Sequence, residues 1–169
     1  MINNGCVVLL TSANKDQANV MTLAWQMPVS VKPPLIAIGV AATHLSNELI
    51  RKTEEFVINV PNGGLLKKVH ACGHVSGRIC DKFKEYGLTL LPAKQIKPPL
   101  IAECIGHLEC GVIDVFRTGD HDVFIGEVQT AAAEKVLFDN YWVSEERTQL
   151  IHHLGGNFYL VNGARVEVK

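Results

Sequence analysis

Short apolar segments separated by polar turns recur along the chain, and most have the length and residue types of β-strands. Four occur early: Gly5–Thr11, Asn19–Trp25, Leu35–Val40 and Glu55–Val60. Runs of a few β-branched and aromatic residues bounded by polar clusters are typical of strands. The polar segment Ser12–Asp16 separates the first two. We therefore expect those two to form a hairpin.

The second half of the chain is also predicted to be rich in strands. The expected segments are Leu108–Phe116, Val123–Ala131, Phe158–Val161 and Ala164–Val168. The first two are separated by a loop, Arg117–Asp122, that contains a glycine and favours a long hairpin. The last two flank Asn162-Gly163, a dipeptide typical of tight hairpin turns.

Three helices are predicted between these strands, at Thr43 to about Thr53, Leu65–Cys72 and Asp81–Tyr86. In the first, leucines and an isoleucine at helical spacing form one apolar face, and Thr43 or Ser46 is expected to cap it. Gly87 is expected to end the third helix. Many short strands with a few short helices predict a mainly β protein, a closed antiparallel β-barrel with short helices added.

Composition narrows the class of protein. At 169 residues, the chain is expected to form one domain spanning residues 1–169. Its formal net charge is −1, so we expect no nucleic-acid partner. The longest apolar runs are too short to cross a bilayer and no secretory leader is recognisable, so no membrane association and a cytoplasmic location are expected.

The cysteines and histidines do not predict a metal site or a disulfide framework. The five cysteines form no C-x-x-C pair and are expected to be reduced, mostly buried thiols. His70-x-Cys72-x-His74 matches no common zinc spacing, although His70 and His74 would share a helix face. We therefore expect no bound metal.

Thr43-His44-Leu45-Ser46, at the expected start of the first helix, is a candidate anion site. Free N–H groups and the helix dipole favour an anion there, and two hydroxyls add donors. In the alternative interpretation, Thr43 is only a helix cap and Ser46 only a surface residue.

A second candidate is Ser76-Gly77-Arg78, followed by Lys82. Small residues let a ligand approach the backbone, and the two cations would neutralise a phosphate or the charged edge of a reduced flavin. Alternatively, this is a polar loop with a solvated Lys82.

Two further segments offer surfaces for a flat ring. Met21, Leu23 and Ala24 would supply apolar contacts from a strand, which is otherwise simply part of the core. His121 follows Gly119-Asp120 at a predicted hairpin tip and is either a solvated loop residue or a contact to a nicotinamide or flavin. The chain has no G-x-G-x-x-G, Walker-type phosphate loop or G-x-S-x-G motif. A nicotinamide cofactor would therefore have to bind over a flavin.

In order along the chain, these segments resemble the flavin reductase-like family of FMN-binding split-barrel proteins, which includes flavoredoxins. The resemblance rests on Asn19–Trp25, Pro33–Ile36, Thr43–Ile50, Glu55–Pro61, Ser76–Arg78 with Asp81–Phe83, and Gly119–His121 with Phe124–Val128. It implies a six-stranded Greek-key barrel and a homodimer that holds FMN near the dimer interface.

The resemblance also implies roles for individual residues. The isoalloxazine ring would be lined by Val20, Met21, Thr22, Leu23 and Ala24. The ribityl chain and phosphate would be surrounded by Ala41, Ala42, Thr43, His44 and Ser46, and closed off by Ser76, Gly77, Arg78 and Lys82. His121 would approach the redox face as the catalytic residue.

The predicted function is that of an FMN-dependent oxidoreductase of the flavin reductase type. NADH or NADPH would reduce FMN at N5, and the electrons would pass to free flavin, ferric iron or a protein acceptor. The alternative is a flavoredoxin-like electron carrier that does not react directly with NAD(P)H. A barrel with a vestigial pocket is a third possibility.

Overall fold

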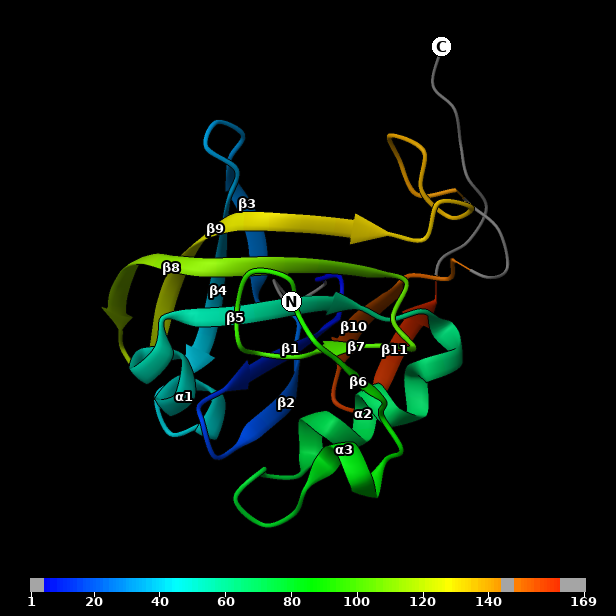
Figure 1. The fold of residues 1–169 in the computed structure, drawn as a ribbon. Helices are drawn as coiled ribbons and strands as arrows, with labels where there is room; N and C mark the ends of the chain where they lie inside the picture. Colours follow the sequence, from blue (N-terminus) through cyan, green and yellow to red (C-terminus); the bar gives the residue numbers. More distant parts are fainter. Residues whose placement is uncertain (1–4, 144–147, 162–169) are drawn as a thin grey trace.

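The computed structural model describes residues 5–143 and 148–161, and in them seven antiparallel strands form the main sheet (Figure 1). Their order across the sheet is β2-β1-β5-β8-β9-β4-β3. The strands are β1 (Val8–Ala13), β2 (Ala18–Leu23), β3 (Gln26–Ser30), β4 (Leu35–Ala41), β5 (Glu55–Val60), β8 (Gly106–Thr118) and β9 (His121–Ala133).

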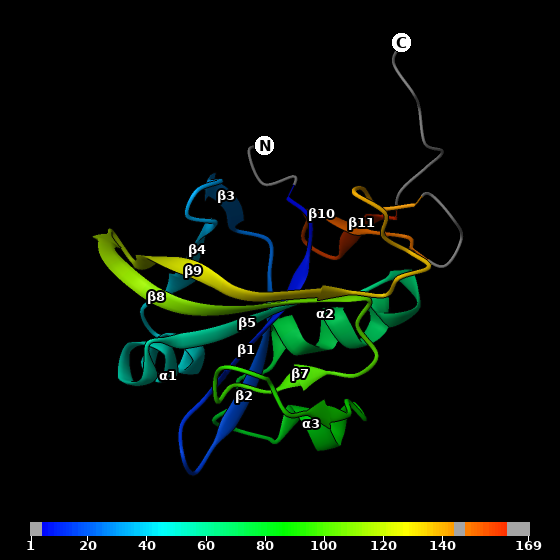
Figure 2. The ribbon, with the colours of Figure 1, turned by 45° about the horizontal axis from the view of Figure 1, so that its top comes forward.

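The connection between the two edge strands explains why this sheet is rolled up. β2 and β3 lie at opposite ends of the strand order but are separated along the chain only by Ala24 and Trp25. The sheet must therefore curl until its edges meet, and a hydrogen bond of 2.9 Å from Gly39 N to Trp25 O continues the β3–β4 pairing into this junction. Register shifts in the β8–β9 pair accompany the bend of this long hairpin, visible in Figure 2.

Two apolar clusters lie on the two faces of β1, whose six residues are all buried. Side chains alternate along a strand, so Leu10 enters the cluster inside the barrel while Leu9 enters the cluster outside it. The outer cluster is covered by α2 (Leu66–His74), which follows the 3₁₀ turn η1 (Gly63–Leu65), and by α3 (Lys82–Glu85). The remaining helix, α1 (Leu45–Thr53), joins β4 to β5.

Two small sheets complete the described fold. β6 (Leu90–Leu91) pairs with β7 (Leu100–Ile101), and β10 (Ile151–Gly155) pairs with β11 (Phe158–Val161). The second hairpin is attached to the start of the chain, because Val7 N donates to Ile151 O at 2.8 Å. Figures 1 and 2 show β3–β4 and β10–β11 on opposite sides of the start of β1.

The predicted class is confirmed: the described chain is mainly β, with short helices on a rolled antiparallel sheet. The main sheet has seven strands rather than six because β3, interrupted by Pro28 and largely exposed, was not predicted. β8 and β9 extend to a tight turn at Gly119-Asp120, so the connecting loop is shorter than expected. The predicted strand Ala164–Val168 and its Asn162-Gly163 turn lie outside the described residues, and β11 pairs instead with the preceding strand β10.

The predicted cap of the first helix is wrong. The N-cap of α1 is His44, and no side chain makes a capping hydrogen bond there. Gly87 does end α3, with a φ of 59°. All five cysteines are free, and Cys72, Cys104 and Cys110 are buried. No helix among the described residues combines the length and apolar character needed to cross a membrane.

Candidate functional site

Two adjoining cavities form one groove between β2, the start of α1 and the end of α2. Their volumes are about 290 and 320 Å³. We call the first the polar compartment and the second the aromatic compartment. Both are bordered by Met21, Thr22, His44, Gly73 and His74, which therefore form the passage between them.

Lys82 gives the polar compartment a positive charge. It is only 4% exposed, and its Nζ donates to Val20 O at 2.7 Å and to Cys72 O at 2.8 Å. Both acceptors are neutral carbonyls, and burial lowers the pKa of the ammonium group. An ammonium has three protons, so one donor remains for a ligand in the compartment. A buried cation without a counter-charge favours an anionic ligand.

Asn19, Ser46 and Gly77 form the opposite part of this compartment. Asn19 Nδ2 donates to Ser46 Oγ at 2.9 Å, and both side chains are buried. A Cβ on Gly77 would come within 2.0 Å of Asn19 Oδ1, so only glycine permits this close approach. Ser46 is therefore no surface residue, and Lys82 is no solvated one, which excludes two alternatives left open by the sequence.

The start of α1 lines the same compartment with Thr43, His44 and Ser46. Its first turn lacks a side-chain cap, which leaves N–H groups for an external acceptor. The pKa of His44 is lowered by burial and then by the positive charges of His121 and Lys82. The sequence around α1 thus concentrates donors and positive charge where an anion would lie.

Asp122 holds α1 against β9. Its buried carboxylate accepts a 2.8 Å hydrogen bond from Asn47 Nδ2 and forms a 2.8 Å ion pair with Arg51. Burial alone would raise the pKa of Asp122, but the hydrogen bonds from Asn47 and Arg51 and the charges of Arg51 and Arg117 outweigh it and keep the pKa below its usual value. This network fixes the helix start beside His121, the neighbour of Asp122 on β9.

The aromatic compartment has one wall from the barrel edge. Trp25, in the β2–β3 junction, stacks on His121 with ring centroids 4.6 Å apart. A carboxylate oxygen of Asp120 lies 2.7 Å from His121 Nδ1. Leu23 and Ala24 add apolar surface. The wall is therefore flat and largely apolar, with one imidazole at its rim.

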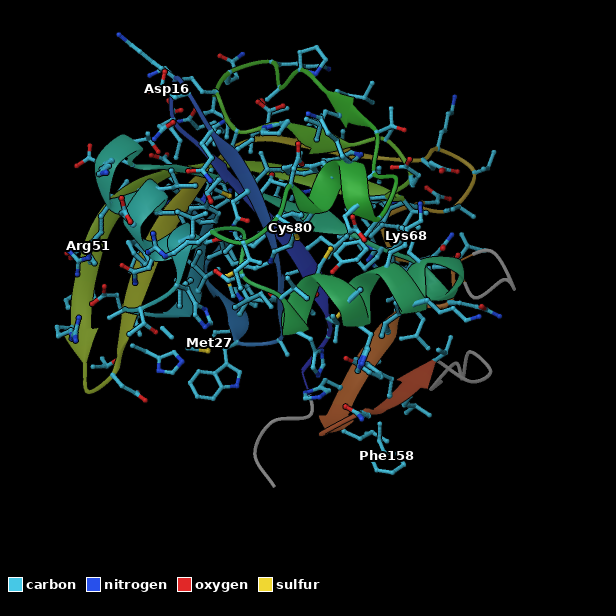
Figure 3. All side chains as sticks on the ribbon, turned by 90° about the horizontal axis from the view of Figure 1, so that it is seen from below. Asp16, Met27, Arg51, Lys68, Cys80 and Phe158 are labelled. Carbon is cyan, nitrogen blue, oxygen red and sulfur yellow. The ribbon has the colours of Figure 1, made fainter. Side chains whose placement is uncertain are left out.

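The facing wall comes from the β10–β11 hairpin, which contributes His153, Gly156 and Tyr159. Tyr159 Oη lies 3.1 Å from His70 Nδ1 on α2, which ties the hairpin to that helix. Figure 3 shows the hairpin lying beside α2, with Phe158 at its tip pointing away from the helix.

Most residues predicted for the site are brought together in this groove. The polar compartment contains Met21, Thr22, Thr43, His44, Ser46, Ser76, Gly77 and Lys82. The aromatic compartment adds Leu23, Ala24, Ala41 and His121. Three predicted residues do not line the groove. Val20 is buried and its carbonyl accepts from Lys82, Ala42 donates its backbone N–H to Asp120 O at 3.0 Å, and Arg78 forms a 3.0 Å ion pair with Glu48.

The groove also contains residues that the sequence did not single out as ligand contacts. These are Val7, Asn19, Trp25, Gly39, Leu45, Cys72, Gly73, His74, Val75, His153, Gly156 and Tyr159. Asn19 and Trp25 are the two ends of Asn19–Trp25, one of the segments on which the family resemblance rests, so the sequence did offer a signal for these two residues. Burial raises the pKa of Cys72 to about 11, so its thiol borders the groove as a neutral group. Within residues 5–143 and 148–161, no three His, Cys, Asp or Glu side chains are grouped to hold a metal ion.

Comparisons with known proteins show what the chain is similar to. The family model described as "Flavin reductase like domain" matches residues 3–156. YddH, an uncharacterised protein of Escherichia coli K12, is 33% identical over 172 residues, which cover 98% of this chain and 91% of that protein. An NADH-dependent FAD reductase of Streptomyces globisporus is 32% identical over 115 residues, 65% of this chain and 62% of the reductase. The crystal structure of flavoredoxin from Methanosarcina acetivorans superposes with a TM-score of 0.89 at 28% identity, covering 99% of this chain and 90% of flavoredoxin.

Proposed function

The chain belongs to the flavin reductase-like family, and from that premise we propose that the groove binds FMN and that the protein is an oxidoreductase of the flavin reductase type. The phosphate would lie in the polar compartment and the isoalloxazine ring in the aromatic compartment. The passage between them, at Thr22 and His44, would hold the ribityl chain.

The observation that carries this proposal is the pairing of an anion site with a flat apolar site in one groove. Lys82 has a spare donor and no opposing charge among its two hydrogen-bond partners. The α1 start and Ser46 supply further donors to the same phosphate. Leu23, Ala24 and Trp25 offer a planar apolar surface to the ring. The residues present therefore fit FMN.

Bound FMN would supply the redox chemistry, by accepting a hydride equivalent from NADH or NADPH at N5 and passing electrons on. The chain's own residues bind, orient and exclude water. His121 is held by Trp25 and Asp120 at the rim of the aromatic compartment, where it would contact the nicotinamide or the acceptor. The acceptors we propose are free flavin, ferric iron or a protein.

The experiment is a pair of spectra. Purified protein, loaded with FMN, should show the flavin bands in the near-ultraviolet and blue, and anaerobic NADH or NADPH should bleach them. Protein that stays colourless after incubation with FMN would contradict the proposal.

The second candidate is an electron carrier, favoured by the 28% identity to flavoredoxin over nearly the whole chain. Such a protein would bind FMN but ignore nicotinamide and accept electrons from a reduced ferredoxin. The same anaerobic titration separates the two functions.

We also propose a homodimer. Apolar side chains are exposed on β3, an edge strand of the sheet, including Met27 at 60% and Val29 at 43%. This edge adjoins the groove through Trp25, so a second copy packed there would shield the ring. Sedimentation of wild type and Met27→Asp protein tests this, with dissociation expected for the variant.

A further inference from the structure

The carboxylate of Asp122 connects β9 to the start of α1 without lining either compartment of the groove. Its Oδ2 accepts from Asn47 Nδ2 and from Arg51 Nε, each at 2.8 Å, and its Oδ1 lies 3.5 Å from Arg117 Nη1. Figure 3 shows Arg51 where α1 lies beside the β8–β9 hairpin. Asp122 is fully buried, so it can act on a ligand in the groove only through the residues that it holds.

Asn47 carries this contact into the first turn of α1. It is the third residue of the helix and is only 2% exposed. Its side-chain amide has two protons, and Nδ2 donates to Val40 O at 3.1 Å as well as to Asp122. The helix start is therefore fixed to the end of β4 and to β9 at the same time.

The same turn contains donors that the protein itself does not use. The N–H of Asn47 donates to His44 O at 3.1 Å, but the N–H groups of Leu45 and Ser46 have no acceptor among the described residues. Leu45 and Ser46 both line the polar compartment, as Lys82 does. The position of this turn therefore decides whether two free N–H groups reach an anion bound beside the ammonium group.

We propose that Asp122 is a positioning residue that orients the first turn of α1 toward the phosphate of FMN, an inference that rests on the proposed function. Through Asn47 it holds the N–H groups of Leu45 and Ser46 at the wall of the polar compartment. Neither Asp122 nor Asn47 lines the aromatic compartment, where the ring would lie. Asp122 therefore determines how strongly the protein prefers FMN over riboflavin, which has the same ring and ribityl chain but no phosphate.

Positioning and simple electrostatics predict opposite effects when the charge of Asp122 is removed. Two arginines surround the one carboxylate, and their side chains are 47% and 60% exposed. Without the carboxylate charge this region would become more positive and attract a phosphate more strongly, although solvent screens exposed guanidinium groups. Release of the first turn would instead weaken phosphate binding, because misplaced N–H groups lose their hydrogen-bond geometry.

The test measures the dissociation constants of FMN and riboflavin by fluorescence titration for wild type and for Asp122→Asn. The new amide has the shape of the carboxylate but presents protons where Asn47 and Arg51 also donate, so it should release the helix start. We expect D122N to weaken FMN binding about tenfold and to leave riboflavin binding within about threefold of wild type.

Asp114→Asn is the matched control for charge. It removes the same charge from the same hairpin, but Asp114 is exposed and accepts from the adjacent Val115 N at 2.8 Å. Both flavins should bind to D114N within about twofold of wild type.

Asn47→Ala breaks the same contact without any change of charge, and it tests the proposal independently of the stability of D122N. Alanine favours the helix, so the main loss is that of the two Nδ2 hydrogen bonds. FMN binding should weaken about fivefold, with riboflavin binding within about threefold of wild type. The visible absorption bands of bound FMN should keep their wild-type positions in both variants, because the surroundings of the ring are unchanged.

Each result decides between the proposal and its alternatives. If D122N binds FMN as tightly as wild type or more tightly, the inference is overturned, because the carboxylate then acts through its charge or not at all. Equal losses of affinity for FMN and riboflavin would also overturn it, since they indicate a general loosening of the fold. A wild-type protein that binds neither flavin would overturn the proposed function, and the inference with it.

Discussion

Two of the regions that contain buried polar side chains differ in how fully the hydrogen bonds of those side chains are satisfied. The first region is where β5 contacts β1 and β7. There, Asn59 Nδ2 donates to Leu9 O at 3.0 Å, while Asn59 Oδ1 accepts from Ile101 N at 2.9 Å and pairs with His107 Nδ1 at 3.0 Å. Glu109, also buried, accepts from the backbone of residues 94 and 95.

In the groove, by contrast, polar groups retain unused capacity. Lys82 uses two of its three donors, and the first turn of α1 has no side-chain cap. Unsatisfied buried groups cost stability, so they persist where a ligand completes them. In these two regions, the saturated groups of Asn59 and Glu109 hold the fold together, whereas the spare donors of Lys82 and the α1 start are available to a ligand.

The largest effect is expected from breaking the saturated region with Asn59→Ala. This change would leave Leu9 O, Ile101 N and His107 without their buried partner, and each orphaned group costs about 1–3 kcal/mol. We expect the free energy of unfolding in urea to fall by about 3–5 kcal/mol, with the FMN dissociation constant of the folded protein within about twofold of wild type. If Asn59→Ala kept the stability of wild type but bound FMN much more weakly, the distinction between groups that hold the fold together and groups that contact the ligand would be wrong.

The next largest effect is expected at Lys82, where we predict a large loss of FMN affinity and a smaller loss of stability. Lys82→Met removes a charge-assisted bond that contributes about 1.5–3 kcal/mol, so FMN affinity in a fluorescence titration should fall about 10- to 100-fold. Adding Ser46→Ala should lower it further. The free energy of unfolding should change less than in Asn59→Ala. Lys82→Met loses the hydrogen bonds to the carbonyls of Val20 and Cys72, but it also removes the cost of burying an ammonium group.

Lys68→Met is the matched control for this variant. Lys68 also donates to a carbonyl, that of Gly87 at 2.7 Å, but it is only half-buried and lies outside the groove. The FMN affinity of Lys68→Met should equal that of wild type. Similar affinities for Lys82→Met and Lys68→Met would remove Lys82 from the phosphate site.

The sequence predicted correctly those elements that are specified by residues adjacent to one another along the chain. β5 was predicted with its observed bounds because apolar residues bounded by turns are a local signal, whereas the exposed β3, containing Pro28, carries none. Arg78 and Lys82 looked equivalent in the sequence, yet one pairs with Glu48 at the surface and the other is buried. Only packing distinguishes them.

The facing wall of the groove could not be predicted for a related reason. Tyr159 reaches His70 across 89 residues of sequence, through a hairpin whose position depends on pairing with the chain start. Such a contact leaves no periodic trace near either residue. The candidate anion site was easier to predict, because its helix start and hydroxyls are adjacent along the chain.

A smaller effect is expected from Gly77→Ala, which tests whether the groove depends on a close backbone approach. The new Cβ would displace the Asn19 side chain and disturb its bond to Ser46, so FMN affinity should fall about tenfold, within the usual range for one substitution. Gly119→Ala is the comparison: its φ of 63° makes the change cost stability, about 1 kcal/mol, but nothing lies within 4 Å of the new atom. That variant should bind FMN normally. If both variants bind FMN as wild type does, the tight packing at Asn19 is irrelevant to the ligand.

The smallest effect is a pH dependence of FMN affinity. In the folded protein without ligand, burial lowers the pKa of Lys82 below 10.5, its ordinary value in the unfolded chain. Between the folded and the unfolded pKa, the unfolded state binds more protons than the folded state, so the free energy of unfolding rises with pH across that window. Below the window, the charged Lys82 costs stability, and a bound phosphate dianion would offset this cost. FMN affinity should therefore decline, by less than about tenfold, as pH rises from neutrality through the lowered pKa. His44 titrates below 6.5 and does not contribute there. The decline should be absent in Lys82→Met, because that variant has no ammonium to neutralise, and a decline of equal size in both proteins would assign it to another group.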